Sequence, residues 1–329
     1  MSDSSDDMEM DAARLYCGKC RKHFEDCNCE NMRRKPMALR GVKPKNVQKR
    51  LKAFFYGNAK VGKTTAAIQF PKPYLIDTER GAENEKYVAM LEKGGGVIFQ
   101  SNDFDEVIKE VSSLMKEKHE YKTLIIDPLT ILYDDLLDKC AAKGISATDK
   151  DGTAFGRHYK AAEKRMKSFY SMLMKLDMNV IITSHAKAQY QMNGKEMILI
   201  GQTFDCYKKM DYMFDLILEV QKRGKERVAI VKGTRINGFT EDETFNFSYD
   251  QIAERYGSES LEKDCAPTDL ANKDQINELK RLIELLHIPQ ETVDKLLKKE
   301  EVEDFEYMSS DYIQKCIAHF TSKIQGEAA

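Results

Sequence analysis

Short apolar runs alternate with amphipathic stretches through the middle of the chain. The runs LKAFFYG, PYLID, VIFQ, TLIID and NVIITS all fall between residues 51 and 184. Between them lie helical patterns, including a long one over 128–177 that is interrupted within 143–156. Continuous apolar strands that alternate with helices are typical of a mainly parallel sheet covered on both faces. We therefore predict an α/β fold with a core domain over residues 51–255.

The pattern changes twice after residue 185. Residues 186–209 are polar and aromatic and are predicted to form a loop, and two β-rich segments follow at 213–224 and 226–235. Beyond Pro267 the sequence is helical throughout. Its apolar positions recur at the i, i+3 and i+4 spacing of an amphipathic helix, at Ile276, Leu279, Leu282, Ile283 and Leu286. This predicts a separate small helical module over 268–325.

Composition indicates a soluble chain with segregated charge. Of 329 residues, 42% are apolar and 32% charged, and no run approaches the roughly 18 apolar residues of a membrane helix. The polar start does not resemble a signal peptide, so we expect a cytoplasmic protein. Residues 1–12 are acidic and predicted to be disordered, whereas 31–52 hold nine Lys or Arg and no acid. That basic linker, 31–50, either meets a polyanion or is only solvated.

Four of the eight cysteines lie together in CGKCRKHFEDCNC. Cys17, Cys20, Cys27 and Cys29 can surround one tetrahedral Zn²⁺, and His23 can replace one of them. Because a cytoplasmic chain does not favour a disulfide framework, we predict a structural zinc knuckle over 13–30. The alternative is a reduced, thiol-rich tail.

The stretch GNAKVGKT fits the pattern G-x-x-x-x-G-K-[ST] and stands between an apolar strand and a helix. Backbone N–H groups of such a loop, with the helix N-terminus, bind phosphates. Lys63 is expected to reach the terminal phosphates, and the Thr64 hydroxyl to bind Mg²⁺. The predicted ATP-binding residues are Gly57, Asn58, Ala59, Lys60, Val61, Gly62, Lys63, Thr64 and Thr65.

A second acidic position follows the buried strand TLIID. Asp127 ends that strand and is predicted to lie beside the P-loop, where its carboxylate can hold the Mg²⁺ shell together with Thr64. An acid at a strand end can also cap the next helix, and Pro128 suits that alternative.

The carboxylate that orients water in many P-loop ATPases directly follows this Asp, but here Pro128 stands in that place. The segment DTE ends the strand after the P-loop helix, and that strand can lie next to the P-loop strand, which would bring Glu79 near the γ-phosphate. Here the sequence resembles the RecA family of recombinase ATPases, whose catalytic glutamate stands in a D-x-E segment. The resemblance implies that Glu79 is the general base, with Asp77 a poorer candidate. A solvated loop carboxylate is the alternative.

The resemblance extends to two further segments. NVIITSH is similar to the family strand that ends in a γ-phosphate sensor, often Gln and here His185. The segment after it is then a single-stranded-DNA loop, because cations and flat rings suit unpaired nucleotides. Its candidate DNA contacts are Lys187, Tyr190, Lys195, Lys208 and Lys209, beside Phe204 and Tyr207. The basic strand end RVAIVKGTR resembles the region that reaches a neighbouring subunit's ATP, which implies Lys232 or Arg235 in trans; a solvent-facing strand end is the alternative.

Over residues 51–250 the chain is most similar to small RecA-type ATPases encoded by bacteriophages with single-strand annealing systems. That implies a homo-oligomer with ATP between subunits, an ATPase stimulated by single-stranded DNA, and ATP hydrolysis that switches DNA affinity, in the host cytoplasm. The helical module is expected to contact a single-strand-binding or other recombination protein. A ring helicase or helicase loader, and a non-DNA ATPase switch acting on a protein partner, remain as alternatives.

Overall fold

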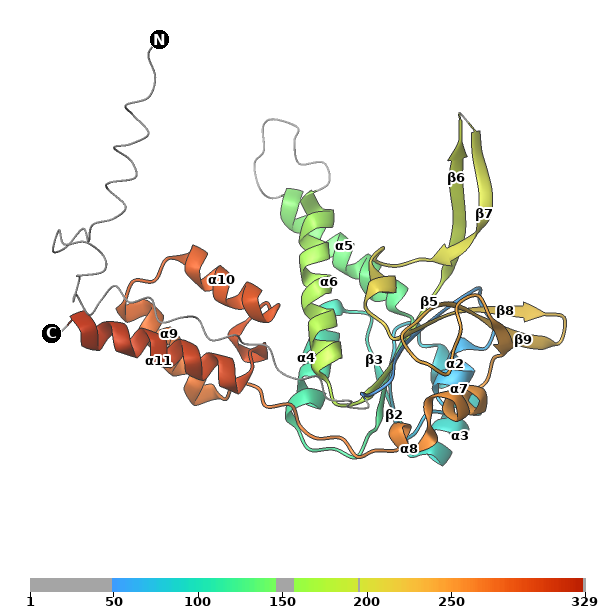
Figure 1. Ribbon diagram of the computed structural model, residues 1–329, viewed down its shortest axis with the longest axis horizontal. Coiled ribbons are helices and arrows are strands. Elements are labelled where there is room, and N and C mark those ends of the chain that lie inside the picture. Colours follow the sequence, from blue (N-terminus) through green and yellow to red (C-terminus); the bar gives the residue numbers. More distant parts are fainter. Residues whose placement is uncertain (1–48, 146–156, 195, 328–329) are drawn as a thin grey trace, which may run out of the picture. The chain divides into compact units, whose positions relative to one another are not determined.

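The computed structural model describes residues 49–145, 157–194 and 196–327 (Figure 1). The predicted acidic tail, the cysteine knuckle and nearly all of the basic linker lie outside these ranges, and so does Lys195. Among the described residues, no helix is long and apolar enough to cross a membrane.

The core is an eight-stranded sheet in the order β10-β9-β8-β1-β5-β4-β2-β3. The six strands from β8 to β3 pair in parallel, and only β9 and β10 are antiparallel. The predicted mainly parallel sheet is therefore confirmed. The strands are β1 Lys52–Tyr56, β2 Pro73–Asp77, β3 Val97–Gln100, β4 Thr123–Asp127, β5 Asn179–Ser184, β8 Leu216–Arg223, β9 Glu226–Thr234 and β10 Thr244–Asn246.

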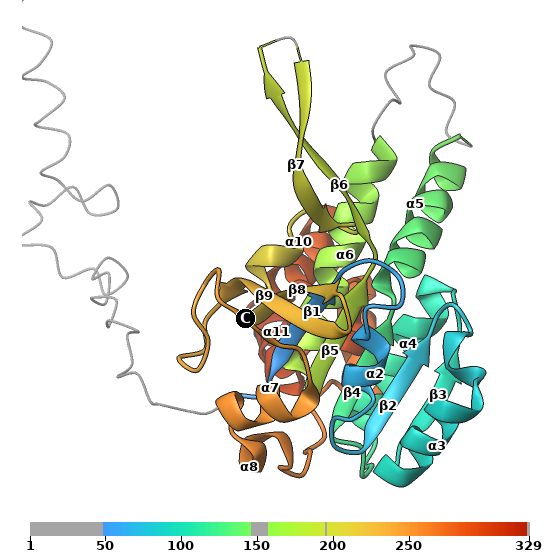
Figure 2. The same ribbon diagram turned by 90° about the vertical axis from the view of Figure 1, so that its right-hand side faces the viewer.

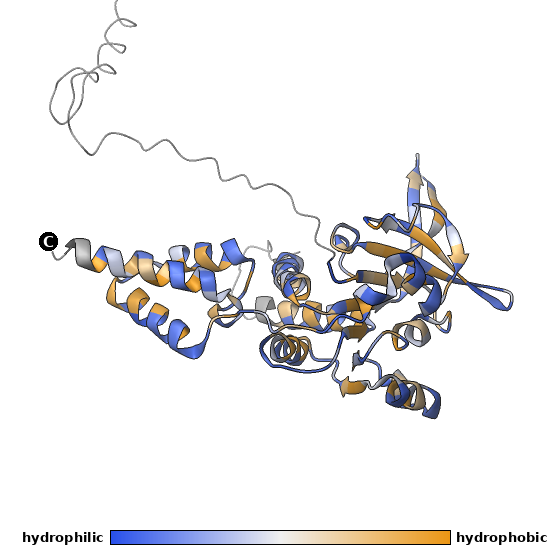
Figure 3. Ribbon diagram, turned by 60° about the horizontal axis from the view of Figure 1, so that its bottom comes forward, coloured by the Kyte–Doolittle hydropathy of each residue, from blue (hydrophilic) through white to orange (hydrophobic). Residues whose placement is uncertain are grey.

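Helices cover both faces of the sheet, because its strands are apolar on both sides. In β1, Phe54 packs into a cluster under α4, α5 and α6, while Phe55 packs into a second cluster with α2, α3, α7 and α8. The strands are correspondingly mostly orange in Figure 3. The helices are α2 Lys63–Ala67, α3 Glu85–Gly94, α4 Phe104–Lys116, α5 Leu129–Ile145, α6 Arg157–Lys175, α7 Tyr249–Tyr256 and α8 Ser258–Leu261, with 3₁₀ turns at Gly81–Glu83 and Met210–Tyr212.

The predicted neighbour relation of β2 is wrong. β2 pairs with β3 and β4, and both β4 and β5 stand between it and β1. Sequence order suggested adjacency, but parallel strands are joined by crossovers that can skip positions. Because the carboxyl ends of all these strands still meet at one edge of the sheet, Asp77 and Asp127 lie opposite each other there.

Residues 186–193 and 196–204 form two paired strands rather than the predicted loop. β6 Ala186–Asn193 and β7 Glu196–Phe204 pair only with each other, and the hairpin extends away from the central sheet in both Figure 1 and Figure 2. Apolar and polar residues alternate along β6, with the sequence AKAQYQMN, and this period-2 pattern is that of a strand, whereas β7 carries the apolar run MILI; both colours are present on the hairpin in Figure 3. The many polar residues of β6 make the composition of this segment resemble that of a loop.

The C-terminal residues that the structure describes form three α-helices and one short 3₁₀ turn. α9 Lys273–Leu285, α10 Gln290–Glu300 and α11 Ser310–Glu327, with a 3₁₀ turn at Phe305–Tyr307, enclose a hydrophobic cluster of their own. Asn272 and Gln275 form a capping box at the start of α9. Arg165 on α6 pairs with Glu303 at 3.1 Å, and Lys175 pairs with Glu300 at 3.4 Å, so the module contacts the core through ion pairs.

Candidate active site

The P-loop fills the connection between β1 and α2. β1 ends at Tyr56, and α2 begins at Lys63 after a left-handed Gly62 with φ +103°. Gly57 lies against β8: a β-carbon there would stand 2.2 Å from the Val220 carbonyl oxygen. Both glycines are therefore required by the backbone, one by its φ and the other by close approach.

Lys63 is held inside the loop. Its side chain is buried, and Nζ donates to the carbonyl oxygens of Gly57 at 2.8 Å and Asn58 at 3.0 Å. Burial lowers the pKa of Lys63, and the negative potential of Asp127 and Glu79 opposes that shift. A phosphate bound in the loop would likewise favour the ammonium form.

Asp127 and Thr64 meet at the bottom of the site. The Thr64 hydroxyl donates to Asp127 Oδ2 at 2.5 Å, and the Thr183 hydroxyl donates to the other carboxylate oxygen. Loss of hydration raises the pKa of Asp127. The Asp127 carboxylate and the Thr64 hydroxyl lie side by side, and the negative charge of the carboxylate needs compensation. This pair of oxygen donors fits Mg²⁺.

These groups line one cavity of about 370 Å³. Residues predicted from the sequence border it, including Lys63 and Thr64 on α2, Glu79 after β2, Asp127 at the end of β4, and His185 after β5. Sequence reasoning missed Tyr87 on α3, which also lines the cavity and lies 3.3 Å, oxygen to oxygen, from Thr65. A tyrosine within a helical pattern does not by itself indicate a nucleotide site, because the strand order decides which helix borders the cavity.

Asp77 and Glu79 have different surroundings. The Asp77 carboxylate is buried and accepts backbone N–H groups of Glu79, Gly81 and Ala82 at 2.8–3.2 Å. Its oxygens are thus used to hold the turn. The Glu79 side chain is 43% exposed and reaches the cavity, so it is the carboxylate that can approach a water there.

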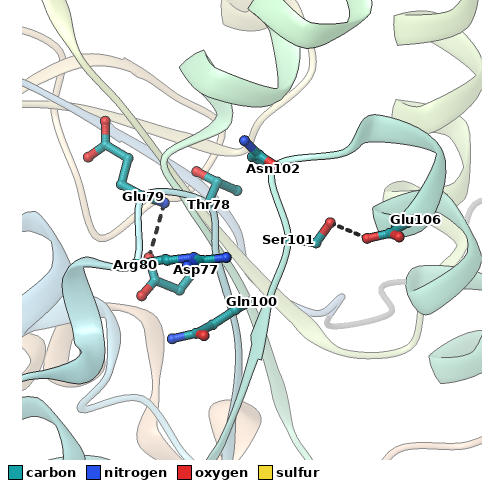
Figure 4. A pocket seen from close by; sticks show the side chains of 8 residues that line it. All are labelled: Asp77, Thr78, Glu79, Arg80, Gln100, Ser101, Asn102 and Glu106. Carbon is teal, nitrogen blue, oxygen red and sulfur yellow. Dashed lines mark hydrogen bonds between the residues drawn. The ribbon is translucent and has the colours of Figure 1, made fainter.

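Glu79 lies beside His185. Glu79 Oε1 is 3.2 Å from His185 Nε2, and the His185 backbone N–H donates to the Thr130 hydroxyl at 3.0 Å. Asp77 and Glu79 also line a second cavity of about 380 Å³ (Figure 4). Gln100 and Ser101 belong to the lining of this second cavity and not to that of the first. In that view the Glu79 carboxylate points away from Gln100 and Ser101.

Of the residues predicted to contact DNA, those that the structure describes do not form one cationic surface. Lys187 pairs with Asp205 at 2.8 Å, and Lys209 pairs with Glu163 at 2.6 Å. Lys208 and Tyr190 are exposed. The expected stacking rings Phe204 and Tyr207 instead pack inward: Phe204 lies 5.2 Å from Phe54, ring to ring, and Tyr207 is buried. The two rings therefore follow the apolar pattern of the core, although the expected stacking role required them to be exposed.

Lys232 and Arg235 do not line the cavity of their own chain. Lys232 Nζ is 3.8 Å from Glu219 Oε2, and Arg235 donates to the Tyr212 carbonyl at 2.6 Å. Because β9 is antiparallel to β8, its end at Thr234 pairs with Leu216, at the edge of the sheet opposite the P-loop.

A family model described as an AAA domain, AAA_24, matches residues 49–246, which is more than half of the chain. The chain belongs to this family. Family membership and the P-loop together imply the use of nucleotide and Mg²⁺. No curated protein matches the sequence.

Among solved structures, the chain is similar to one titled as the crystal structure of the RadB recombinase. The match has 19% identity and a TM-score of 0.39, and it covers 60% of this chain and 86% of that one. A likeness at this level carries no argument about activity.

Within the described ranges, no group of three or more His, Cys, Asp or Glu side chains is arranged to hold a metal ion. The predicted zinc ligands Cys17, Cys20, Cys27 and Cys29 lie outside those ranges, so the zinc knuckle stays a prediction.

Proposed function

We propose that this AAA domain protein is a RecA-like recombination or annealing ATPase that binds single-stranded DNA, and that ATP hydrolysis switches its DNA affinity. One observation carries the proposal: His185 borders the nucleotide cavity beside Glu79, and the exposed β6–β7 hairpin begins at the next residue. A change at the γ-phosphate can therefore reach a protruding surface through a single residue.

In this proposal the cavity residues divide the work. The P-loop amides and Lys63 bind the phosphates, and Thr64 with Asp127 holds Mg²⁺, which offsets the charge that develops on the phosphates. Glu79 accepts a proton from, or orients, the attacking water. Its 43% exposure and the absence of backbone donors on its carboxylate, within the described residues, support this role over Asp77.

His185 is joined to both strands of the hairpin at its base. Its carbonyl oxygen accepts the Asp205 N–H at 2.8 Å and the Ser184 hydroxyl at 3.0 Å, and that hydroxyl also reaches the Asp205 carbonyl at 3.3 Å. When the His185 ring exchanges Glu79 for a γ-phosphate oxygen, any movement of its backbone is passed to residues 186 and 205 together. This supports a switch in which the hairpin tilts as a unit.

The hairpin carries groups suited to unpaired bases. Tyr190 pairs with Leu199 and Met192 with Met197 across the strands, so these four side chains share one face. Their exposed fractions are 56–66%. Flat and polarisable apolar groups can pack on base faces, and Lys208 at the base of the hairpin can meet a phosphate.

A second candidate is a non-DNA ATPase switch that acts on a protein. The pairing of Lys187 with Asp205 and of Lys209 with Glu163 favours it, because the exposed hairpin face is then apolar rather than cationic. Such a face also suits a protein groove.

ATP hydrolysis with and without single-stranded DNA separates the two candidates. We expect DNA to stimulate the wild-type protein, and Tyr190→Ala to lose most of the stimulation while keeping the basal rate. The matched control is Tyr212→Ala, an exposed tyrosine outside the hairpin, which should respond to DNA as the wild type does. A turnover rate that ignores DNA would favour the protein switch.

The remaining expectations are part of the same proposal. Subunits would assemble with ATP between them, and Lys232 or Arg235 would serve the neighbouring site; the 40% and 60% exposure of these side chains leaves them accessible. Four cysteines in thirteen residues support a structural Zn²⁺. The C-terminal helices would bind a single-strand-binding or other recombination protein.

A further inference from the structure

The turn between β8 and β9 brings basic residues to the P-loop edge of the sheet. Residues 222–227, KRGKER, include four basic residues and one acid. β8 runs parallel to β1, so its C-terminal end lies at the edge where the P-loop begins, and Lys222 pairs with Arg227 there. This is the opposite edge from Arg235.

Arg227 lies against the P-loop itself. A β-carbon built on Gly62 would stand 2.8 Å from Arg227 Cδ and 2.9 Å from its Nε. Gly62 borders the nucleotide cavity and directly precedes Lys63. The Arg227 side chain thus lies beside the backbone that a triphosphate would contact.

The Arg227 guanidinium has no interaction partner among the described residues. Within the described residues it makes no hydrogen bond, ion pair or ring contact, and the residue is exposed. Two basic residues of β8 and β9 have partners of their own. Arg223 donates to the Gln221 side chain at 3.2–3.3 Å, and Lys232 lies near Glu219. An unpaired cation next to an anion-binding loop raises the positive potential in that loop.

We propose that Arg227 binds the phosphate chain of the nucleotide held by the P-loop of its own subunit. Guanidinium groups suit this role because they stay charged and present a planar set of donors to phosphate oxygens. The proposal rests on nucleotide binding at the P-loop and goes beyond it. The cations expected from the β8–β9 region were Lys232 and Arg235, acting on the nucleotide of a neighbouring subunit. It also gives Gly62 a second requirement, because any side chain there would displace Arg227.

The test is the dissociation constant for Mg²⁺-ATP and for Mg²⁺-ADP, measured on the full chain by displacement of a fluorescent nucleotide. Loss of one charged hydrogen bond corresponds to roughly a tenfold weakening, which we expect for Arg227→Ala. Arg227→Lys should keep part of the affinity. Lys225→Ala removes a cation from the same turn and should stay within about twofold of the wild type if the effect is local rather than general.

Thermal unfolding guards against a folding defect. Without nucleotide, Arg227→Gln should melt as the wild type does, and the rise in Tm on adding ATP should shrink. Wild-type affinity in both Arg227→Ala and Arg227→Gln, or an equal loss in Lys225→Ala, would overturn the inference. Lys63→Ala is the reference: if it also binds ATP normally, the proposed nucleotide site itself is wrong, whereas a loss in Lys63→Ala alone rejects only the role of Arg227.

Discussion

The nucleotide cavity and the β6–β7 hairpin differ in how their side chains are held: the cavity has polar groups fixed by hydrogen bonds, and the hairpin has exposed apolar groups. In the cavity, Lys63, Thr64 and Asp127 are each fixed by hydrogen bonds to neighbouring groups. In the hairpin, Tyr190 and Leu199 are 56% and 60% exposed and pair with each other across the two strands. Preorganised polar groups serve chemistry, because they need not rearrange as charge develops. An exposed apolar face serves contact with something outside the chain.

His185 joins these two regions. It belongs to the cavity through its ring and to the hairpin through its backbone. The comparison therefore predicts that substitutions in the cavity change turnover, that substitutions in the hairpin change contacts, and that His185 affects their coupling.

The largest effect is expected for Glu79→Gln. Removing the group that accepts a proton should lower ATP turnover by about a hundredfold or more, because general-base contributions are of this size. The variant keeps the shape of the side chain, so ATP affinity should stay close to wild type. Steady-state hydrolysis and equilibrium nucleotide binding measure the two quantities, and normal hydrolysis would show that the base lies elsewhere.

Asp77→Asn should act on stability instead. The Asp77 carboxylate accepts three backbone N–H groups, and replacing a buried charged acceptor by an amide should lower the free energy of unfolding by about 1–3 kcal/mol. Urea unfolding of the variant and of Glu79→Gln gives the contrast. Equal stability of the two proteins would mean that the turn does not depend on Asp77.

The smallest effect on stability is expected in the hairpin. Leu199→Ser changes an exposed side chain, so the free energy of unfolding should stay within about 0.5 kcal/mol of wild type. Affinity for single-stranded DNA should nevertheless fall several-fold. A matched variant on the other face, Gln191→Ser, should leave both quantities unchanged, and an equal loss of affinity in both variants would contradict a role for the apolar face.

The sequence predicts the cavity far better than the hairpin, for physical reasons. The P-loop has a fixed spacing because its glycines must meet φ and close-approach limits, and Asp127 ends a buried strand that periodicity reveals. The place of β2 depends on crossovers between strands, which local patterns do not encode. Arg227 reaches Gly62 only through the pairing of β8 with β1, and the inward packing of Phe204 depends on β1 residues 150 positions earlier in the chain.

The most direct test of the account is the affinity for single-stranded DNA in two nucleotide states, with and without His185. Fluorescence anisotropy would compare Glu79→Gln with ATP and with ADP, and then the double variant Glu79→Gln/His185→Ala. The account predicts at least about a tenfold difference between the nucleotide states, equal to 1.4 kcal/mol of coupling, and its loss in the double variant. An unchanged difference without the His185 side chain would contradict the claim that this residue connects the nucleotide site to the hairpin.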